Sequence, residues 1–167
     1  QFYLDKNRVI RICELITKRG IKISFNVSSG SSVWLLDASL LNILKKAGLY
    51  RLTFPIESAS TQTLKYIRKP IDLDKTKVLI RTANRMGIWT YANFIIGFPF
   101  ETHEDIKKTF QYAKSCGLDY ATFFIAKPYV GSDMYDTFRE HGLLKKKGFE
   151  PTTMGECDCD TLNFKAD

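Results

Sequence analysis

The sequence predicts an α/β fold in which helices cover a sheet of parallel strands. Helical patterns alternate with short apolar runs, and four of these runs each follow a helix. The runs recur at intervals of roughly 30 residues, the usual length of a βαβ unit. They are apolar on both faces, as expected when helices cover a parallel sheet. The pattern is compatible with both a doubly wound sheet and a (β/α) barrel.

Start and stop signals place the first elements in order. Apolar residues at helical spacing predict a helix over Asp5–Arg19, and Gly20 supplies the stop. The apolar run Ile21–Val27 is the first predicted strand. Asp37 can cap a second helix, which ends at Gly48.

The rest of the chain repeats this order of strand and helix. The later strands are predicted at Tyr50–Ile56, Ile88–Ile96 and Asp119–Ala126. The later helices are predicted to begin at Ser60, at Asp72 or Asp74, at Thr102 and at Ser132, and to end at Ile67, Gly87, Gly117 and His141. Each of them begins at a side chain that can cap a helix N-terminus.

Composition and cysteine usage limit the class of protein. The 167 residues are 44% hydrophobic, which is enough for one well-buried core, and the net charge of +7 favours an anionic ligand or partner. We find no apolar stretch that could span a membrane and no signal peptide. Cys13 and Cys116 are interpreted as small buried hydrophobes, and Cys157 and Cys159 as an incidental pair of exposed thiols. A redox pair, or ligands shared with absent sequence, are alternatives for the latter two. We expect a cytoplasmic protein.

The segment 93–102 contains the most informative motif. An apolar run ends at Gly97 and Pro99, and Thr102 with Asp105 then forms a capping-box pattern. Glycine takes positive φ and lets another group approach the backbone closely. Ligands bind at the C-terminal ends of strands in α/β folds, so this segment is predicted to mark the working face.

Polar residues follow the other strands as well. They are Asn26 and Ser28 after the first strand, Glu57 and Ser58 after the second, and Lys127 and Tyr129 after the fourth. A carboxylate at position 57 can accept hydrogen bonds from ligand hydroxyls or an ammonium group. The structural alternative is a salt bridge from Glu57 to Arg51 or Lys69.

The acidic run Glu101–Asp105 is interpreted as a helix start and not as a metal site. Acidic residues are favoured in the first turn of a helix, and His103 lacks a second histidine at i+4. His141 is predicted to lie near a helix C-terminus, where a positive charge is stabilising. We therefore predict no metal ligands in this chain. The sequence also contains no nucleophile elbow, phosphate loop or dinucleotide fingerprint.

Three of these segments, in this order and spacing, resemble the radical SAM core. They are Glu57–Ser58 after a strand, Gly97–Thr102 about forty residues further on, and Lys127–Ser132 after the next strand. The chain is similar above all to the branch shared by methylthiotransferases and cobalamin-dependent radical SAM enzymes. Phe2–Asp5 resembles that family's second-strand exit, and Asp160–Phe164 resembles the segment that leaves the core in the cobalamin branch.

The resemblance implies a partial, open (β/α) TIM-type barrel with parallel strands and outer helices. It implies S-adenosylmethionine and a [4Fe-4S] cluster as cofactors, which together generate a 5′-deoxyadenosyl radical for hydrogen abstraction or for methyl or methylthio transfer. It leaves open a cobalamin carried by an absent N-terminal domain. In such an enzyme the cofactors supply the radical chemistry, and the protein binds and positions them.

The resemblance also implies roles for named residues. Glu57 and Ser58 would contact the ribose or the methionyl end of S-adenosylmethionine. The adenine would be lined by the backbone of Ile95, Gly97, Phe98 and Pro99. The cofactor or substrate would lie near Asn26, Ser28, Lys127 and Tyr129. No catalytic residue is implied.

This chain departs from the family pattern in one major respect, since the three-cysteine motif CxxxCxxC is absent. That motif would lie upstream with the first two strands, so residues 1–144 correspond to the later two-thirds of the core. Residues 145–167 are predicted to be a linker or the start of a C-terminal region. We expect a fragment, inactive alone, whose first strand has an unpaired edge that invites dimerisation.

Two alternatives stay open at this point. One is a barrel domain that has lost the cluster and its catalysis. The other is a phosphate-binding, aldolase-like barrel, although no Gly-rich loop precedes a helix at the late strands. The substrate, whether a small molecule, an RNA or a protein, is set by loops and flanking regions and is not indicated by the sequence.

Overall fold

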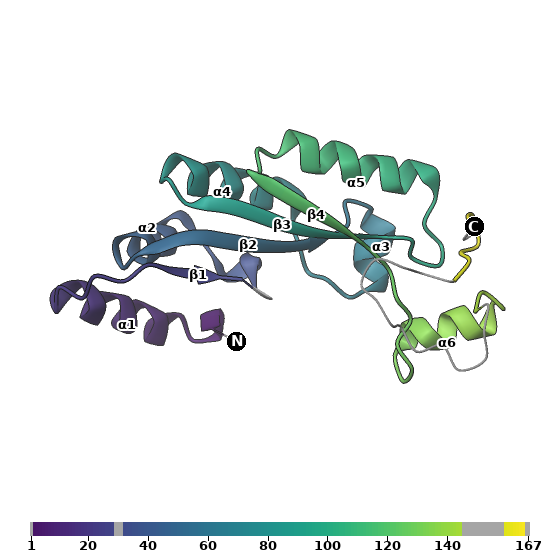
Figure 1. The fold of residues 1–167 in the computed structure, drawn as a ribbon, viewed down its shortest axis with the longest axis horizontal. Coiled ribbons are helices and arrows are strands. Elements are labelled where there is room, and N and C mark those ends of the chain that lie inside the picture. Colours follow the sequence, from purple (N-terminus) through teal and green to yellow (C-terminus); the bar gives the residue numbers. More distant parts are fainter. Residues whose placement is uncertain (1, 29–31, 145–158, 166–167) are drawn as a thin grey trace. The chain divides into compact units, whose positions relative to one another are not determined.

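The computed structural model describes residues 2–28, 32–144 and 159–165. It has a four-stranded sheet with the strands in the order β1–β2–β3–β4 (Figure 1). The strands are β1 Phe25–Val27, β2 Leu49–Glu57, β3 Trp89–Ile96 and β4 Tyr120–Ile125. The strands are parallel and flanked by helices, which confirms the predicted α/β class and the sequential strand order.

Six α-helices in the described residues match the predicted ones. They are α1 Lys6–Lys18, α2 Ala38–Lys46, α3 Thr61–Tyr66, α4 Leu73–Arg85, α5 His103–Ser115 and α6 Asp133–Glu140. Two short 3-10 helices occupy Phe2–Leu4 and Val33–Leu35. In the described ranges, none of the helices has the length and apolarity that crossing a membrane requires.

Helix starts follow the predicted capping residues. The side chains of Asp5, Asp37, Ser60, Asp72 and Ser132 each accept a hydrogen bond from a backbone N–H three residues further on. These bonds satisfy donors that a helix start leaves unpaired. At α4 the cap is Asp72 and not Asp74, which lies inside the first turn.

The chain forms two compact units, which we describe separately. Unit 1 comprises residues 1–56, 70–93 and 112–121, and unit 2 comprises residues 57–69, 94–111 and 122–167. The core of unit 1 is built from side chains that are fully buried, among them Val9, Leu40, Leu41, Leu44, Leu52 and Ile80. Burial of such aliphatic side chains is the main favourable term in folding.

Strand β1 is shorter than the predicted Ile21–Val27. Ile21 and Ile23 are 48% and 42% exposed, and pairing with β2 begins only at Phe25, with a shift of register between Phe25 and Asn26. The reason is a close crossing of two backbone segments, because a Cβ atom at Gly48 would lie 2.0 Å from the Ile23 carbonyl oxygen. The Phe25 N–H then donates to the Gly48 carbonyl at 3.1 Å, and the ladder starts there.

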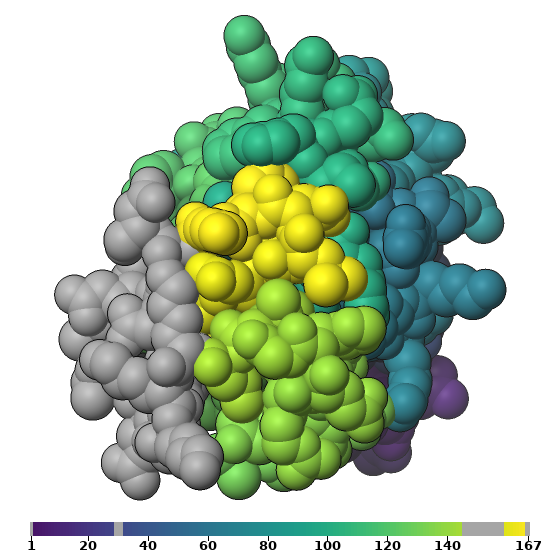
Figure 2. Space-filling view, turned by 90° about the vertical axis from the view of Figure 1, so that its right-hand side faces the viewer, coloured from purple at the N-terminus to yellow at the C-terminus, as the bar shows by residue number. Residues whose placement is uncertain are grey.

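The last described residues of the chain pack within unit 2. Figure 2 shows Cys159–Lys165 (yellow) lying against α6 (yellow-green). Cys159 is 5% exposed and packs in a small core with Phe138 and Leu143. The prediction of an exposed thiol is therefore wrong for Cys159, because its strand-like bridge to Leu144 turns it into that core. Cys157 and residues 145–158 lie outside the described part, and the boundary at residue 144 stays a prediction.

Candidate functional site

Unit 2 contains the C-terminal ends of three strands and the loops that follow them. The predicted site residues Glu57 and Ser58, the segment Ile95–Pro99, Lys127 and Tyr129 all belong to it. Asn26 and Ser28 are exposed residues of unit 1, where the Asn26 amide donates to the Tyr50 hydroxyl at 3.3 Å. The structure thus collects most of the predicted residues into one compact unit.

Glu57 ends β2 in an unusual backbone conformation. Its φ is 69°, in the left-handed region that side chains other than glycine rarely adopt. Its carboxylate forms a salt bridge with Lys69 at 2.8 Å, and both side chains are 18% exposed. The predicted structural alternative with Lys69 is therefore confirmed, whereas the alternative with Arg51 is wrong, because the Arg51 guanidinium lies 5.8 Å from the centre of the Trp89 ring.

Ser58 is fully buried and belongs to a polar network. Its hydroxyl lies 3.3 Å from the Thr109 hydroxyl and accepts from the Ser60 N–H at 3.1 Å. The Thr109 hydroxyl also accepts from the Ala59 N–H at 3.1 Å. This network fixes the exit of β2 against α5, and a contact of Ser58 with the cofactor stays a prediction.

The centre of this network is Glu101, a carboxylate that is 2% exposed. One carboxylate oxygen accepts from the N–H groups of Gly97 and Phe98 at 2.7 and 3.3 Å. The other accepts from the hydroxyls of Thr63 and Ser58 at 3.4 and 3.5 Å. One side chain thereby ties the turn after β3 to the exit of β2 and to α3.

The prediction that the acidic run 101–105 is a helix start is confirmed for Glu104 and Asp105, which lie in the first turn of α5, but is wrong for Glu101. Glu101 precedes the helix, and within the described residues no lysine or arginine pairs with its carboxylate. Its only sequence signal was its place directly after the glycine–proline turn. Local spacing could not show that the side chain folds back onto Gly97, because that depends on how the turn closes.

The turn after β3 has the geometry that its residues predict. Gly97 has φ 84°, as its position after the apolar run suggested, and Pro99 and Phe98 are buried. The Ala126 N–H donates to the Ile96 carbonyl at 2.8 Å, so the exits of β3 and β4 are adjacent. The Tyr66 ring of α3 contacts the Phe98 ring edge-to-face.

The predicted capping box at the start of α5 is confirmed. The Asp105 carboxylate accepts from the N–H and hydroxyl of Thr102 at 3.1 and 2.6 Å, and the Asp105 N–H donates back to that hydroxyl. The hydrogen bond from the Thr102 hydroxyl holds the pKa of Asp105 below its usual value. In the described ranges no three histidine, cysteine or acidic side chains are grouped so that they can hold a metal ion.

The C-terminal segment covers the turn after β3. The Leu162 N–H donates to the Pro99 carbonyl at 3.0 Å. The Asn163 amide donates to the carbonyls of Phe100 and Glu101 at 3.3 and 3.0 Å. Three consecutive carbonyls of this turn are therefore satisfied by Leu162 and Asn163, which holds the turn in place from outside.

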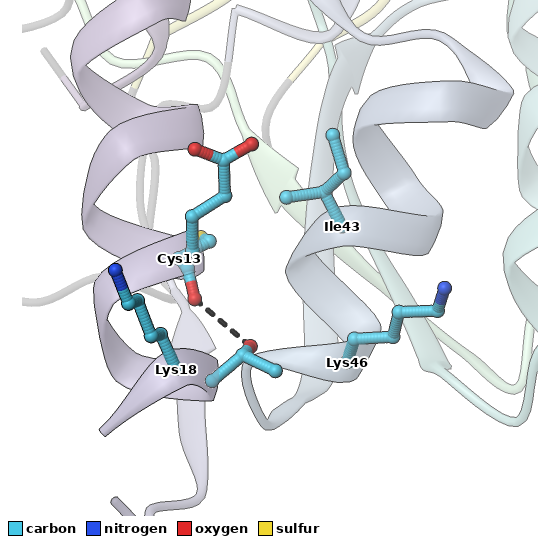
Figure 3. A pocket seen from close by; sticks show the side chains of 6 residues that line it. Cys13, Lys18, Ile43 and Lys46 are labelled. Carbon is cyan, nitrogen blue, oxygen red and sulfur yellow. Dashed lines mark hydrogen bonds between the residues drawn. The ribbon is translucent and has the colours of Figure 1, made fainter. Parts of the chain in front are cut away.

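A hollow of 270 Å³ in unit 1 lies between α1 and α2 and is lined by Cys13, Lys18, Ile43 and Lys46, among others (Figure 3). Cys13 is 1% exposed, and burial raises the pKa of its thiol. Its backbone carbonyl accepts from the Thr17 hydroxyl at 2.9 Å. The prediction of a small buried hydrophobe is therefore confirmed for Cys13.

We predict that Glu101 makes the stability of the protein fall as the pH rises. Burial raises the pKa of its carboxyl above the usual 4.5, so the folded state keeps a proton that the unfolded state has lost. The free energy of unfolding contributed by this group is full below pH 4.5 and is lost as the pH rises through the folded pKa. Denaturant unfolding across this range, compared with Glu101→Gln, measures the effect, and a pH-independent difference between the two proteins would contradict it.

The comparison with protein families decides the identity of the fold. The model of the radical SAM superfamily matches residues 3–113. The chain belongs to the radical SAM superfamily. The match contains Glu57, the turn at Gly97 and Glu101, and the resemblance inferred from the motifs is confirmed.

Characterised and uncharacterised methyltransferases are among its relatives. The chain is 35% identical over 143 residues to an uncharacterized methyltransferase of Pyrococcus horikoshii, a match that covers 86% of this chain and 31% of that protein. It is 37% identical over 112 residues to the cytidylyl-2-hydroxyethylphosphonate methyltransferase of Streptomyces wedmorensis, covering 63% and 21%. The chain therefore spans less than a third of the length of these curated relatives.

Solved structures show the same fold. The radical S-adenosylmethionine methyltransferase TsrM of Kitasatospora setae, solved with cobalamin and a [4Fe-4S] cluster bound, matches with a TM-score of 0.70 at 16% identity, covering 97% of this chain and 34% of TsrM. Coproporphyrinogen III oxidase of Escherichia coli matches with a TM-score of 0.60 at 19% identity, covering 75% and 30%. The fold of this radical SAM chain is thus the partial TIM-type barrel of these enzymes.

Proposed function

We propose that this chain is the S-adenosylmethionine-binding part of a radical SAM enzyme. In the whole protein it would work with a [4Fe-4S] cluster in hydrogen abstraction or in methyl or methylthio transfer. The relatives named as methyltransferases support methyl transfer as the first of these to test. When bound and given an electron by the cluster, S-adenosylmethionine would supply the 5′-deoxyadenosyl radical, and the residues of this chain would bind and orient it.

The observation that carries the proposal is the strained backbone of Glu57. A left-handed conformation costs a residue other than glycine about 1–2 kcal/mol. Such strain persists where the surrounding structure enforces it, and it is concentrated at functional sites. Glu57 stands at the exit of β2 with its carboxylate held by Lys69, which presents acceptor oxygens in a partly buried place. Carboxylate oxygens there suit the hydroxyls of a ribose.

The turn after β3 supports the same site. Gly97 has φ 84° and no side chain, and Glu101 engages the N–H groups of Gly97 and Phe98, so the backbone of this turn is held in one conformation. Ile95 is half-buried at the end of β3 and offers an apolar contact. We propose that Ile95 and the backbone of Gly97–Pro99 hold the adenine.

The described residues do not fit the [4Fe-4S] cluster. Such a cluster needs several thiolate ligands close together. Cys13 and Cys116 are buried in unit 1, Cys159 is buried in the core of unit 2, and they form no metal-binding group in the described part of the chain. We therefore propose that the cluster ligands, and any cobalamin site, come from outside this sequence and that the chain alone is inactive. A cytoplasmic location and pairing through the edge strand β1 also stay predictions.

We expect Glu57→Gln to weaken S-adenosylmethionine binding about tenfold to a hundredfold and to leave the fold intact. The change removes one charged partner from the hydrogen bonds to the cofactor, which costs about 1.5–3 kcal/mol. Calorimetric titration of the anaerobically reconstituted whole protein measures the affinity, and circular dichroism checks the fold.

Asp133→Asn is the matched control. It makes the same carboxylate-to-amide change in an ion pair of unit 2, that of Asp133 with Arg68, which is exposed on both sides. Its cofactor affinity should equal that of the wild type. An unchanged affinity in Glu57→Gln, together with a lowered melting temperature, would show that the pair with Lys69 is structural only.

A further inference from the structure

Lys127 has a side chain that is largely buried and an ammonium group that pairs with none of the described residues. It is 8% exposed, and among the described residues no hydrogen bond or ion pair engages its ammonium group. The other buried polar side chains of unit 2 all have hydrogen-bond partners; they are Ser58, Ser60, Thr63, Glu101 and Thr109. Lys69, another lysine of unit 2 with a largely buried side chain, is paired with Glu57.

The position of Lys127 is set by the exits of two strands. It follows β4 directly, after Ala126, whose N–H donates to the Ile96 carbonyl at 2.8 Å. A Cβ atom at Gly97 would lie 3.6 Å from the Ile125 side chain, so the two exits are in contact. Ala126, Lys127 and Pro128 are all buried, which holds this stretch of backbone in place.

The two acids of unit 2 at the exits of β2 and β3 are already engaged. Glu101 receives four donors of its own, and Glu57 is paired with Lys69. The Lys127 ammonium group is not one of the fully buried polar atoms that lack a partner in the described residues, so it reaches solvent while its stem is packed. A lysine held in this way at the strand exits can meet an anionic group that arrives with the ligand.

We infer that Lys127 binds an anionic oxygen group, a carboxylate or a phosphate, of the molecule that occupies the strand exits of unit 2. The inference rests on the proposed function for the location of that molecule. A lysine ammonium is a compact charge with three donors and suits either group. Two sources have this chemistry, the methionyl carboxylate of S-adenosylmethionine and an acidic group of the substrate.

The test measures how fast each lysine of the whole protein reacts with an amine-selective reagent, read by peptide mass spectrometry. The reaction is run without ligand, with inorganic phosphate, with acetate and with S-adenosylmethionine, and Lys107, an exposed residue of α5, serves as internal reference. We expect phosphate or acetate to slow the reaction at Lys127 several-fold and to leave that at Lys107 unchanged.

Substitution provides the second arm. Lys127→Met should weaken phosphate binding about tenfold or more, as the loss of a charged hydrogen bond does, while Lys127→Arg keeps the charge and stays within a few-fold of the wild type. Lys107→Met makes the same charge change at an exposed position and should have no effect. If Lys127→Met does not fold, the labelling of the wild type and the phosphate titration of Lys127→Arg still test whether Lys127 binds the anion.

The outcomes separate the two sources. Protection of Lys127 by S-adenosylmethionine alone assigns the anion to the cofactor, whereas protection by phosphate on the cofactor-loaded protein assigns it to the substrate. Phosphate protection in a protein that binds no S-adenosylmethionine would overturn the proposed function and keep the anion site. No protection by any of the three ligands, or equal phosphate affinity in Lys127→Met and wild type, would overturn the anion site.

Discussion

Replacing Glu101 by alanine is expected to destabilise the protein by about 3–5 kcal/mol, an unusually large effect for one side chain. The substitution leaves the N–H groups of Gly97 and Phe98 without their acceptor and removes the partner of the Thr63 hydroxyl. Each buried donor left unsatisfied costs about 1–3 kcal/mol, and the lost volume adds a cavity. Because the turn after β3 would no longer be held, S-adenosylmethionine binding should be lost as well.

Glu101→Gln is the matched variant for this prediction. Its carbonyl oxygen can accept from the two backbone N–H groups, and its amide can donate to the hydroxyls of Ser58 and Thr63, which rotate to accept. We expect its unfolding free energy to stay within about 1 kcal/mol of the wild type. Urea unfolding followed by circular dichroism compares the three proteins. Equal stability of the alanine and glutamine variants would show that the network does not hold the turn.

Replacing Gly48 by alanine is expected to cost about 3 kcal/mol or more. Gly48 has φ 111°, and an added Cβ atom would lie 2.0 Å from the Ile23 carbonyl oxygen. That atom belongs to the backbone and cannot rotate away, so the segment before β1 must move. The movement would break the hydrogen bond from the Phe25 N–H to the Gly48 carbonyl, with which the pairing of β1 begins. Overpacking and left-handed strain act together here.

Gly20→Ala separates the two causes. Gly20 follows α1 as Gly48 follows α2, and it also has a positive φ, of 65°, but no atom lies within 4 Å of its added Cβ. It should therefore show only the left-handed strain, about 1–2 kcal/mol. Thermal unfolding measures both variants. If Gly48→Ala were no more destabilising than Gly20→Ala, the close approach of Ile23 would not be a constraint on the fold.

Much of the fold was predictable from short stretches of sequence. The predicted caps at Asp37, Ser60 and Ser132 are the observed ones, because a capping side chain bonds to a backbone group only three residues away. The capping box of Thr102 and Asp105 and the positive φ of Gly97 were predictable for the same reason. The motif order at Glu57, Gly97 and Lys127 also pointed to the radical SAM family, which the family match over residues 3–113 confirms.

What the sequence determined by itself was therefore local: where helices begin, which runs are strands, and which turn follows β3. The tertiary structure alone decided that Glu101 is a buried acceptor, that β1 begins only at Phe25 and that Cys159 is buried. It also decided that Glu57 pairs with Lys69 while Lys127 pairs with no described residue. These outcomes depend on contacts between segments far apart in the chain. The spacing of residues in the sequence allows several partners for such a side chain, and burial and close approach in the folded protein select one of them.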